Sequence, residues 1–296
     1  MTIRRYPIPT RKAPPRREIP PPVRRRALRR NPAGLLGLII LTLIVAATLL
    51  ASALAPYDPL DMTPSQQLLP PSLAHPLGTD LFGRDVLSRV LYGARISLLV
   101  GGLAALIAAL PGILLGLVSG YYGGRIDSAT MRVMDTLLTF PGLIVALGIV
   151  AVLRPGLSNV TLAVGLAGIP AYTRVVRSSV LTVKRSLYVR AARAVGCRDS
   201  RILFRHILPN VLAPVIVLST LNVGRSILHA SALSFLGLGV QPPTPEWGAM
   251  INEGREILRL APWVSLTPAA MILLTVLGIN LLGDGLRDAL DPRLRA

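Results

Sequence analysis

Long uncharged runs constrain this sequence more than any other feature. Residues 35–54 contain no charged side chain, and comparable apolar runs recur along the chain. A helix needs about 20 mostly apolar residues to cross a bilayer. A hydrophobic content of 52%, only 16% charged residues and a mean hydropathy of +0.58 fit this pattern. The runs therefore predict an all-α membrane protein.

We expect about six membrane-spanning helices. Their predicted ranges are residues 33–54, 96–118, 134–152, 160–176, 211–233 and 262–282. Proline and small residues are dense in these runs, which favours a closely packed bundle over isolated anchors. The first run ends in ASALA, which resembles a signal-peptidase site. However, it is longer than the roughly 7–15 apolar residues of a signal peptide, so an uncleaved first span is predicted.

Basic residues are distributed unevenly between the predicted spans. They concentrate in the N-terminal arm and in residues 173–206, and they outnumber acids in residues 119–133. The long loops on the other side hold fewer basic than acidic residues. Segments rich in lysine and arginine stay on the cytosolic side of a membrane. We therefore expect both termini to be cytosolic.

The net charge of +18 could indicate a nucleic-acid binder. The basic clusters flank apolar spans, however, so membrane lipid is the expected contact and nucleic acid is not. Anionic headgroups contribute roughly 1 kcal/mol per basic residue near the surface. Residues 1–32 combine arginines with prolines, a composition that prevents a packed core. They are predicted to form a disordered cytosolic arm.

A basic, helix-prone segment lies between two apolar runs and reads YVRAARAVGCRDSRILFRHILPN, residues 188–210. Ser186 and Asp199 are positioned to cap two short helices, and Gly196 to end the first of them in the left-handed conformation. Pro209 is expected to close the second helix. Alanines give the first helix a low profile, which recognition in a groove requires. A solvated basic loop placed by the charge rule is the alternative.

Within this segment, AARAVG followed by FRHILPN resembles the EAA signature of ABC importer permeases. The resemblance implies a cytosolic loop that docks onto an ATPase subunit. The matching residues are Ala191, Ala192, Gly196, Leu208 and Pro209. Arg190 stands where the signature has glutamate, and His206 where it often has an aliphatic residue. These two departures concern the polar contacts to the ATPase rather than docking itself.

Longer stretches resemble one branch of these permeases, the dipeptide/oligopeptide/nickel family. They are APYDP, HPLGTDLFGRDVLSRVLYGARISL, ALSFLGLGVQPPTPEWGAMINEGR, APW and NLLGDGLRDALDPRL, in this order. The resemblance covers nearly everything from residue 31 to the C-terminus. It implies a type I ABC importer permease bundle in the cell inner membrane, which carries di- or oligopeptides. Nickel or another small solute is the alternative cargo.

The same resemblance implies four kinds of partner: a second homologous permease, two ATPase subunits, an extracytoplasmic substrate-binding protein and membrane lipid. ATP and Mg would be held by the ATPase subunits, with no cofactor in this chain. The expected regions are the arm (1–32), the first span with an extracytoplasmic loop (33–95), the permease core (96–283) and a cytosolic tail (284–296). The coupling segment is residues 186–209 of the core.

The predicted outer loop contains HPLGTDLFGRD, with His75, Asp80 and Asp85. Their spacing lacks the compact ligand pairs of a dedicated metal site. We instead expect a structured loop in which Gly78 and Gly83 supply turns and Asp85 pairs with an arginine four residues later, Arg89. Family resemblance places this loop near the docking site of the binding protein. Trp247, in a later outer loop, is expected either to anchor in the headgroup region or to touch the binding protein.

Charged residues are rare within the spans. Asp135, Arg225 and His229 are candidates for the translocation path or for pairing with the partner permease. An ion-driven secondary transporter is the alternative class, for which Asp135 and His229 offer the only relay groups. The sequence contains no G-x-x-x-x-G-K-[ST], G-x-S-x-G, H-E-x-x-H or C-x-x-C motif. We therefore expect a transport subunit rather than an enzyme.

Overall fold

The computed structural model describes residues 31–290. The predicted disordered arm, apart from its last two residues, and the end of the predicted tail therefore lie outside the described residues. Within residues 31–290 all regular structure is helical, apart from a single β-bridge between Thr79 and Asp85. The prediction of an all-α protein is confirmed.

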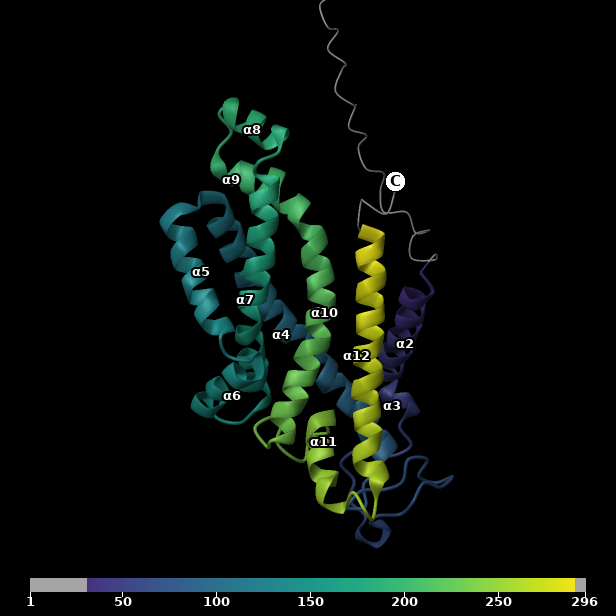
Figure 1. The fold of residues 1–296 in the computed structure, drawn as a ribbon. Coiled ribbons are helices and arrows are strands. Elements are labelled where there is room, and N and C mark those ends of the chain that lie inside the picture. Colours follow the sequence, from purple (N-terminus) through teal and green to yellow (C-terminus); the bar gives the residue numbers. More distant parts are fainter. Residues whose placement is uncertain (1–30, 291–296) are drawn as a thin grey trace, which may run out of the picture.

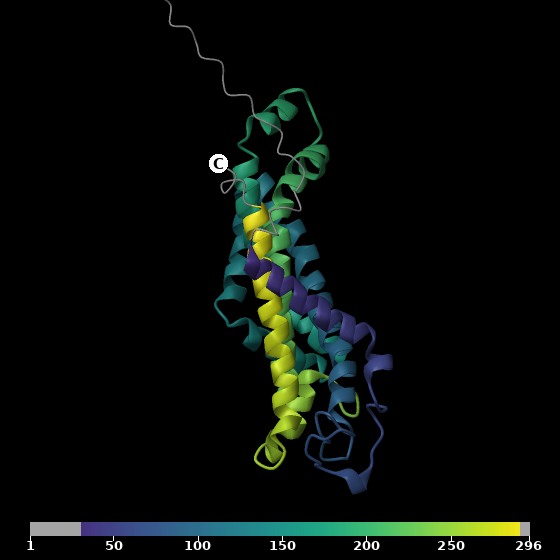
Figure 2. The ribbon, with the colours of Figure 1, turned by 90° about the vertical axis from the view of Figure 1, so that its right-hand side faces the viewer.

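Long helices run side by side along the molecule (Figure 1). They are α2 (Pro32–Leu49), α4 (Val86–Tyr122), α7 (Leu157–Val183), α10 (Leu208–Phe235) and α12 (Pro262–Leu290). α12 lies beside α2 and α10, whereas α4 packs most extensively against α7. Figure 2 shows α2 crossing α12 at an angle. Glycines allow this crossing, because a Cβ on Gly34 would lie 3.0 Å from the Cα of Gly285.

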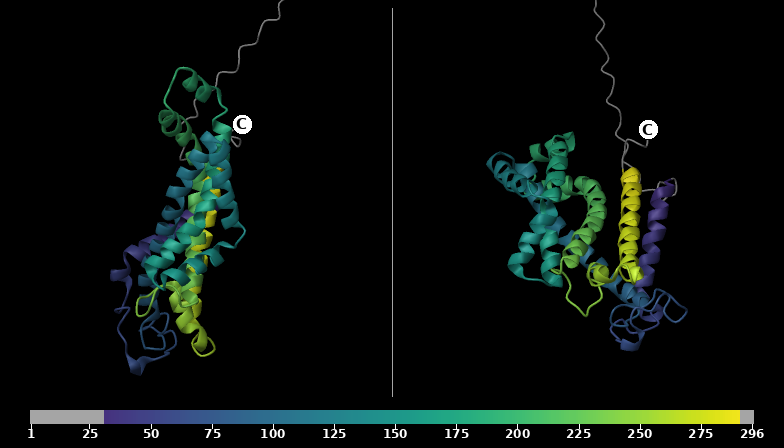
Figure 3. Two further views of the ribbon diagram at one scale, coloured as in Figure 1. Left: turned by 90° about the vertical axis from the view of Figure 1, so that its left-hand side faces the viewer. Right: turned by 60° about the horizontal axis from the view of Figure 1, so that its bottom comes forward.

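Shorter elements occupy the flanks and ends of the bundle. They are α3 (Ala51–Leu54), α5 (Gly124–Leu138), α6 (Gly142–Leu153), α8 (Leu187–Ala194), α9 (Asp199–Arg201) and α11 (Trp247–Gly254). Two 3₁₀ turns, Pro64–Gln66 and Arg255–Ile257, and a π-helical turn, Ile202–Ile207, complete them. α8 and α9 lie at one end of the molecule, and α11 and the loop of residues 55–85 lie at the other (Figure 3).

Within the described residues 31–290, four helical segments are long and apolar enough to cross a membrane: α2, α4, the segment Asp199–Phe235 that includes α10, and α12. Taking α5 and α6 together as one span gives a fifth. About six were predicted. The remaining predicted span, residues 160–176, corresponds to α7, whose 27 residues suffice in length but include Arg174, Arg177 and several hydroxyl side chains in the second half.

Several predicted span boundaries differ from the structure, and the third and second spans show this most clearly. The third span is not one helix, since α5 and α6 meet at a bend of 90°. Pro141 stands at this break, where it removes a backbone donor and disfavours helical geometry at the preceding residue. The second helix begins already at Val86 rather than at residue 96. Asp85 caps it by accepting a hydrogen bond from the Ser88 amide at 2.8 Å.

The contact between α4 and α7 is the most extensive helix contact of the bundle. Gly112, Gly116 and Gly120 recur at every fourth position along the α4 face that meets α7. A Cβ on Gly116 would lie 2.7 Å from the carbonyl oxygen of Thr173. No side chain other than hydrogen permits this approach. A buried cluster around Leu117 and Val176 continues this contact toward α8.

Candidate coupling elbow and a buried ion-pair cluster

The predicted coupling segment, residues 186–209, forms an elbow at one end of the bundle (Figure 1). α8 ends as predicted at Gly196, whose φ of +78° is left-handed. The amide of Gly196 donates to the Arg193 carbonyl at 3.0 Å, and the Cys197 amide to the Ala192 carbonyl at 3.1 Å. This pair of hydrogen bonds is a Schellman motif, which satisfies the carbonyls at the helix end.

Three details of the elbow differ from the sequence prediction. Ser186 is the N-cap residue of α8, but its hydroxyl donates backward to the Val183 carbonyl instead of capping. Asp199 is not the cap of α9, because Arg198 holds that position. Pro209 does not close a helix. It lies at the start of α10, directly after the π-helical turn Ile202–Ile207, and the helical segment Asp199–Phe235 continues through it.

The elbow has a buried apolar face and an exposed one. Val189, Ala192, Ile202, Leu203 and Ile207 are buried against α4, α7 and α10. Leu187 and Val195 are 77% and 78% exposed, and Phe204 is also exposed. Three large apolar side chains of one short segment are therefore left uncovered, which makes the elbow a candidate contact site for another protein.

The docking residues predicted from the family signature divide between these faces. Arg190, Ala191, Gly196 and Pro209 are exposed. Leu208 is half-buried, and Ala192 faces the bundle. Ala192 therefore packs the elbow onto the helices, and only the exposed residues are accessible to another protein.

Tyr121, at the end of α4, contacts the elbow. Its hydroxyl donates to the Asp199 carboxylate at 2.5 Å, and the Arg193 guanidinium lies 5.3 Å from the centre of its ring. Hydrogen bonding to the Tyr121 hydroxyl raises the pKa of the Arg193 guanidinium, which therefore stays charged. The sequence prediction missed Tyr121, because its partner Asp199 is 78 residues away.

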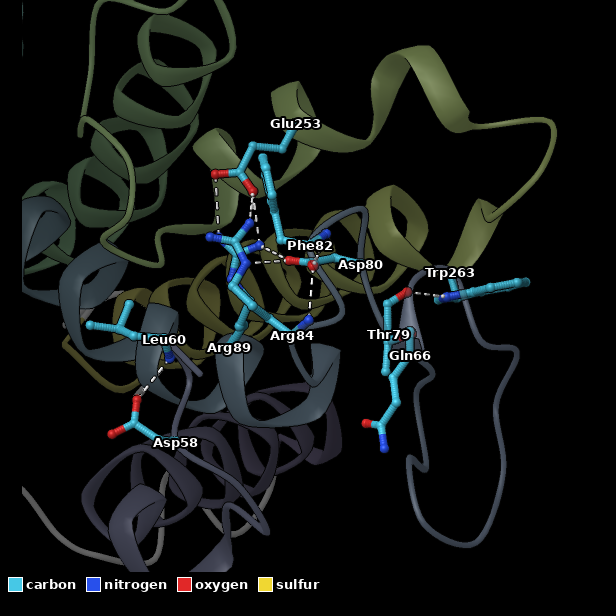
Figure 4. Close-up of polar contacts among 10 residues, drawn as sticks. All are labelled: Asp58, Leu60, Gln66, Thr79, Asp80, Phe82, Arg84, Arg89, Glu253 and Trp263. Carbon is cyan, nitrogen blue, oxygen red and sulfur yellow. Dashed lines mark hydrogen bonds and ion pairs between the residues drawn. The ribbon is translucent and has the colours of Figure 1, made fainter. Parts of the chain in front are cut away.

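A buried ion-pair cluster lies at the opposite end of the molecule (Figure 4). Asp80 Oδ2 accepts from Arg84 Nε at 2.7 Å and from Arg89 Nη1 at 2.6 Å. Both arginines also reach Glu253 Oε2, at 2.6 and 2.8 Å. The two arginines and Asp80 have side chains at most 2% exposed, and Glu253 is 17% exposed. The cluster ties the loop of residues 55–85 and α4 to α11.

The predicted pair between Asp85 and Arg89 is absent, because Arg89 turns to Asp80 and Glu253 instead. The Asp85 carboxylate caps α4 with one oxygen and contacts His75 with the other, at 3.0 Å between Asp85 Oδ1 and His75 Nδ1. The other ring nitrogen of His75 lies 3.1 Å from Gln66 Oε1. Among residues 31–290 no group of three or more histidine, cysteine or acidic side chains could hold a metal ion.

The turns predicted in this loop are present. Gly78 and Gly83 have φ values of +73° and +76°, and a Cβ on Gly83 would lie 2.0 Å from the Thr63 carbonyl oxygen. Glycine is required at both positions by backbone conformation and by space. The end of the loop around these two glycines is thus packed, with residues 78–80 and 83–85 buried.

Trp247 occupies a different environment from either one predicted. Its side chain is fully buried, and its indole Nε1 donates to the Val90 carbonyl at 3.1 Å. It can therefore neither anchor in lipid headgroups nor touch a docked protein. Glu246, beside it, caps α11 by accepting from the Gly248 and Ala249 amides. Both residues fasten α11 to α4.

The charged residues predicted within the spans lie on two different helices, Asp135 on α5 and the other two on α10. Asp135, on α5, pairs with Arg174 of α7 at 2.6 Å, and both side chains are about half exposed. Arg225, on α10, is exposed and forms no ion pair with any residue between 31 and 290. His229 lies one turn further along α10, near Gly142 of α6.

These features define a class of protein: a multi-span helical membrane protein with an exposed elbow at one end and a buried ion-pair cluster at the other. The family model of the binding-protein-dependent transport system inner membrane component matches residues 112–296. A second model, the N-terminal transmembrane domain of oligopeptide transport permease C, matches residues 24–71. The chain therefore belongs to the family of binding-protein-dependent transport permeases of the inner membrane.

Curated relatives resemble the chain over nearly its whole length. The dipeptide transport system permease protein DppC of Alkalihalophilus pseudofirmus is 45% identical over 271 residues, which cover 92% of this chain and 89% of the relative. The di/tripeptide transport system permease protein DppC of Pseudomonas aeruginosa is 48% identical over 90% of this chain and 89% of the relative. The glutathione transport system permease protein GsiD of Pectobacterium atrosepticum is 47% identical over 92% of this chain and 90% of the relative.

Proposed function

We propose that this chain is the permease subunit of an ATP-driven importer of short peptides. The relatives named for dipeptides, di/tripeptides and glutathione support this cargo, since glutathione is itself a tripeptide. Similarity at 45–48% identity extends through both ends of the bundle rather than one motif. The substrate class thus rests on whole-chain likeness.

The elbow end of the bundle faces the cytosol in this proposal. Three observations support this orientation. The basic residues of the segment 173–206 gather there. The beginning of α2 and the end of α12 lie at the same end (Figure 1). Asn31 Nδ2 donates to Asp288 Oδ2 at 2.7 Å, so the two ends of the described chain emerge together. Because segments rich in lysine and arginine stay on the cytosolic side, the basic segment places this end of the bundle, with the start of α2 and the end of α12, in the cytosol.

The partners are a second permease, two ATPase subunits that hold ATP and Mg, and an extracytoplasmic binding protein. The exposed Leu187, Val195 and Phe204 of the elbow supply the apolar surface that enters a groove of the ATPase. Closure of the ATPases on ATP displaces the elbow, and the bundle changes between inward and outward access. The observation that carries this proposal is that the elbow exposes these large apolar side chains in a segment that also exposes several arginines.

Photo-cross-linking in the assembled complex tests the docking. Benzoyl-phenylalanine placed at Val195 is expected to capture an ATPase subunit. The matched control is the same group at Leu73, a fully exposed apolar residue in the loop at the other end. It should capture the binding protein or nothing. Capture of an ATPase subunit from position 73, or of the binding protein from position 195, would reverse the orientation.

Uptake into proteoliposomes tests the energy source and the cargo. Radiolabelled alanyl-alanine is expected to accumulate only with the binding protein and internal ATP present. Uptake that ignores ATP but collapses with an ion gradient would replace this proposal by an ion-driven transporter. Accumulation of Ni²⁺ without any dipeptide uptake would change the substrate class while retaining the ATP-driven mechanism.

A further inference from the structure

The elbow reaches the rest of the molecule through few polar contacts. Within residues 31–290, Tyr121 is the only residue outside the elbow and its flanking helices, α7 and α10, that makes polar side-chain contact with it. The Tyr121 hydroxyl donates to Asp199 at 2.5 Å on one side of the elbow, and Arg193 of the other elbow helix lies over the Tyr121 ring. One side chain of α4 thus contacts both helical arms of the elbow.

The same end of α4 is fastened to α7. Lys184 Nζ donates to the Gly120 carbonyl at 2.6 Å, next to Tyr121. Arg177 of α7 holds the Asp127 carboxylate with two hydrogen bonds of 2.5 Å, and Ser119 of α4 donates to that same carboxylate. Paired hydrogen bonds between a guanidinium and a carboxylate fix orientation as well as distance. The end of α4, the start of α5 and α7 are thereby locked together.

Apolar packing makes the elbow part of this unit. Tyr121 is only 6% exposed and lies in one buried cluster with Val180 of α7, Val189 of α8 and Ile202 of the π-helical turn. A Cβ on Gly120 would lie 2.8 Å from the Val180 Cβ, so α4 has no room to slide past α7 here. Interfaces packed this closely move as units rather than deform.

α4 also connects the two ends of the protein. Its 37 residues extend about 55 Å at 1.5 Å per residue. Arg89 in its first turns belongs to the buried ion-pair cluster, and Tyr121 stands one residue before its end. A displacement applied at Tyr121 therefore acts on a helix whose other end is held in that cluster.

We propose that the Tyr121–Asp199 hydrogen bond latches the elbow to α4, so that Tyr121 is a positioning residue for transport. Movement of the elbow passes through this bond into α4 and along it toward the ion-pair cluster. The inference rests on the proposed function, in which an ATPase moves the elbow. It assigns Tyr121 no contact with substrate or nucleotide.

Tyr121→Phe tests the latch in the full complex, reconstituted into vesicles of phosphatidylethanolamine and phosphatidylglycerol. The substitution keeps the ring, its packing and the ring face over which Arg193 lies, and removes the hydroxyl with its hydrogen bonds to Asp199 and Arg193. We expect alanyl-alanine imported per ATP hydrolysed to fall about fivefold or more, the usual scale of coupling between sites. Tyr122→Phe is the matched control, because the neighbouring Tyr122 is exposed and its hydroxyl has no hydrogen bond among residues 31–290. It should leave the ratio unchanged.

Asp199→Ala provides the second arm, since Asp199 is exposed and its loss leaves no cavity. It should lower the same ratio, and the double variant with Tyr121→Phe should be no worse than the more severe single variant. Asp199→Asn, which retains an acceptor oxygen, should restore part of the coupling. A wild-type ratio in Tyr121→Phe, or fully additive losses in the double variant, would overturn the latch.

Cross-linking from Val195 separates failure of the latch from failure of the docking. We expect benzoyl-phenylalanine at position 195 to capture the ATPase equally well with Tyr121 and with Tyr121→Phe. If Tyr121→Phe shows normal capture and an unchanged ratio of import to ATP hydrolysis, the latch proposal is wrong but the docking proposal stands. If no ATPase subunit is captured even with Tyr121 intact, the docking proposal, on which the latch depends, is wrong.

Discussion

Arg89 of α4 and Glu253 of α11 lie 164 residues apart in sequence and form a buried ion pair, with Nη1 and Oε2 at 2.8 Å. Asp80 and Arg84 complete the group, in which two positive and two negative charges balance. Charges removed from water are tolerated only when they are paired in this way. The pair thus holds α11 and the preceding loop against the start of α4.

Breaking this cluster should destabilise the end of the bundle that carries it. Glu253→Ala leaves two nearly buried guanidinium groups with Asp80 as their only carboxylate. We expect a loss of about 3 kcal/mol, the lower end for a broken buried pair because Glu253 is partly exposed. Thermal unfolding in detergent measures it. Glu256→Ala, whose side chain is 81% exposed, is the control and should change stability by less than about 0.5 kcal/mol. Equal effects of the two variants would contradict the cluster's role.

The glycine contact between α4 and α7 predicts a steric effect. Gly116→Ala places a Cβ 2.7 Å from the Thr173 carbonyl oxygen and from the Val176 Cβ, which forces the helices apart. Overpacking of this kind costs about 1–3 kcal/mol. Gly102→Ala is matched in chemistry and lies on the same helix, but no atom lies within 4 Å of its added Cβ. It should be neutral or slightly stabilising in the same unfolding measurement. A destabilised Gly102→Ala beside an unaffected Gly116→Ala would refute the packing.

Gly196 predicts a conformational effect rather than a steric one. Its φ of +78° disfavours other residues, although no atom lies within 4 Å of an added Cβ. Gly196→Asp should therefore distort the end of α8 at a cost of about 1–2 kcal/mol and lower transport, while the chain still inserts into the membrane. Gly196→Asn, which tolerates the left-handed conformation better, should retain more transport. Normal transport by Gly196→Asp, measured as alanyl-alanine uptake, would argue against a role of the elbow in coupling.

The burial of Trp247 predicts a spectroscopic result. In a Trp263→Phe variant the remaining fluorescence comes from Trp247, which is fully buried. We expect blue-shifted emission that iodide in the solution barely quenches. The reverse variant, Trp247→Phe, retains the partly exposed Trp263 and should be quenched more strongly. Strong quenching of Trp247 would place it at a surface, as the sequence alone had predicted.

Local signals in the sequence were sufficient for the helices and for the ends of the elbow. The uncharged run that became α2 and the glycine that ends α8 act through their immediate neighbours, by backbone satisfaction and by φ. The family signature of the elbow is equally local, because it lies within one short segment. Such features depend on residues a few positions apart and can be recognised without tertiary structure.

The sequence by itself determined the all-helical membrane architecture, the position of the elbow and the turns at Gly78 and Gly83. Only the tertiary structure decided which charges pair, that Trp247 is buried and that Tyr121 holds Asp199. Arg89 had Asp85 one turn away, yet it pairs with Asp80 and with the distant Glu253. The physical reason is that a buried charge takes the partner that packing brings within reach. That partner is set by how α4, α7 and α11 meet, which no local spacing encodes.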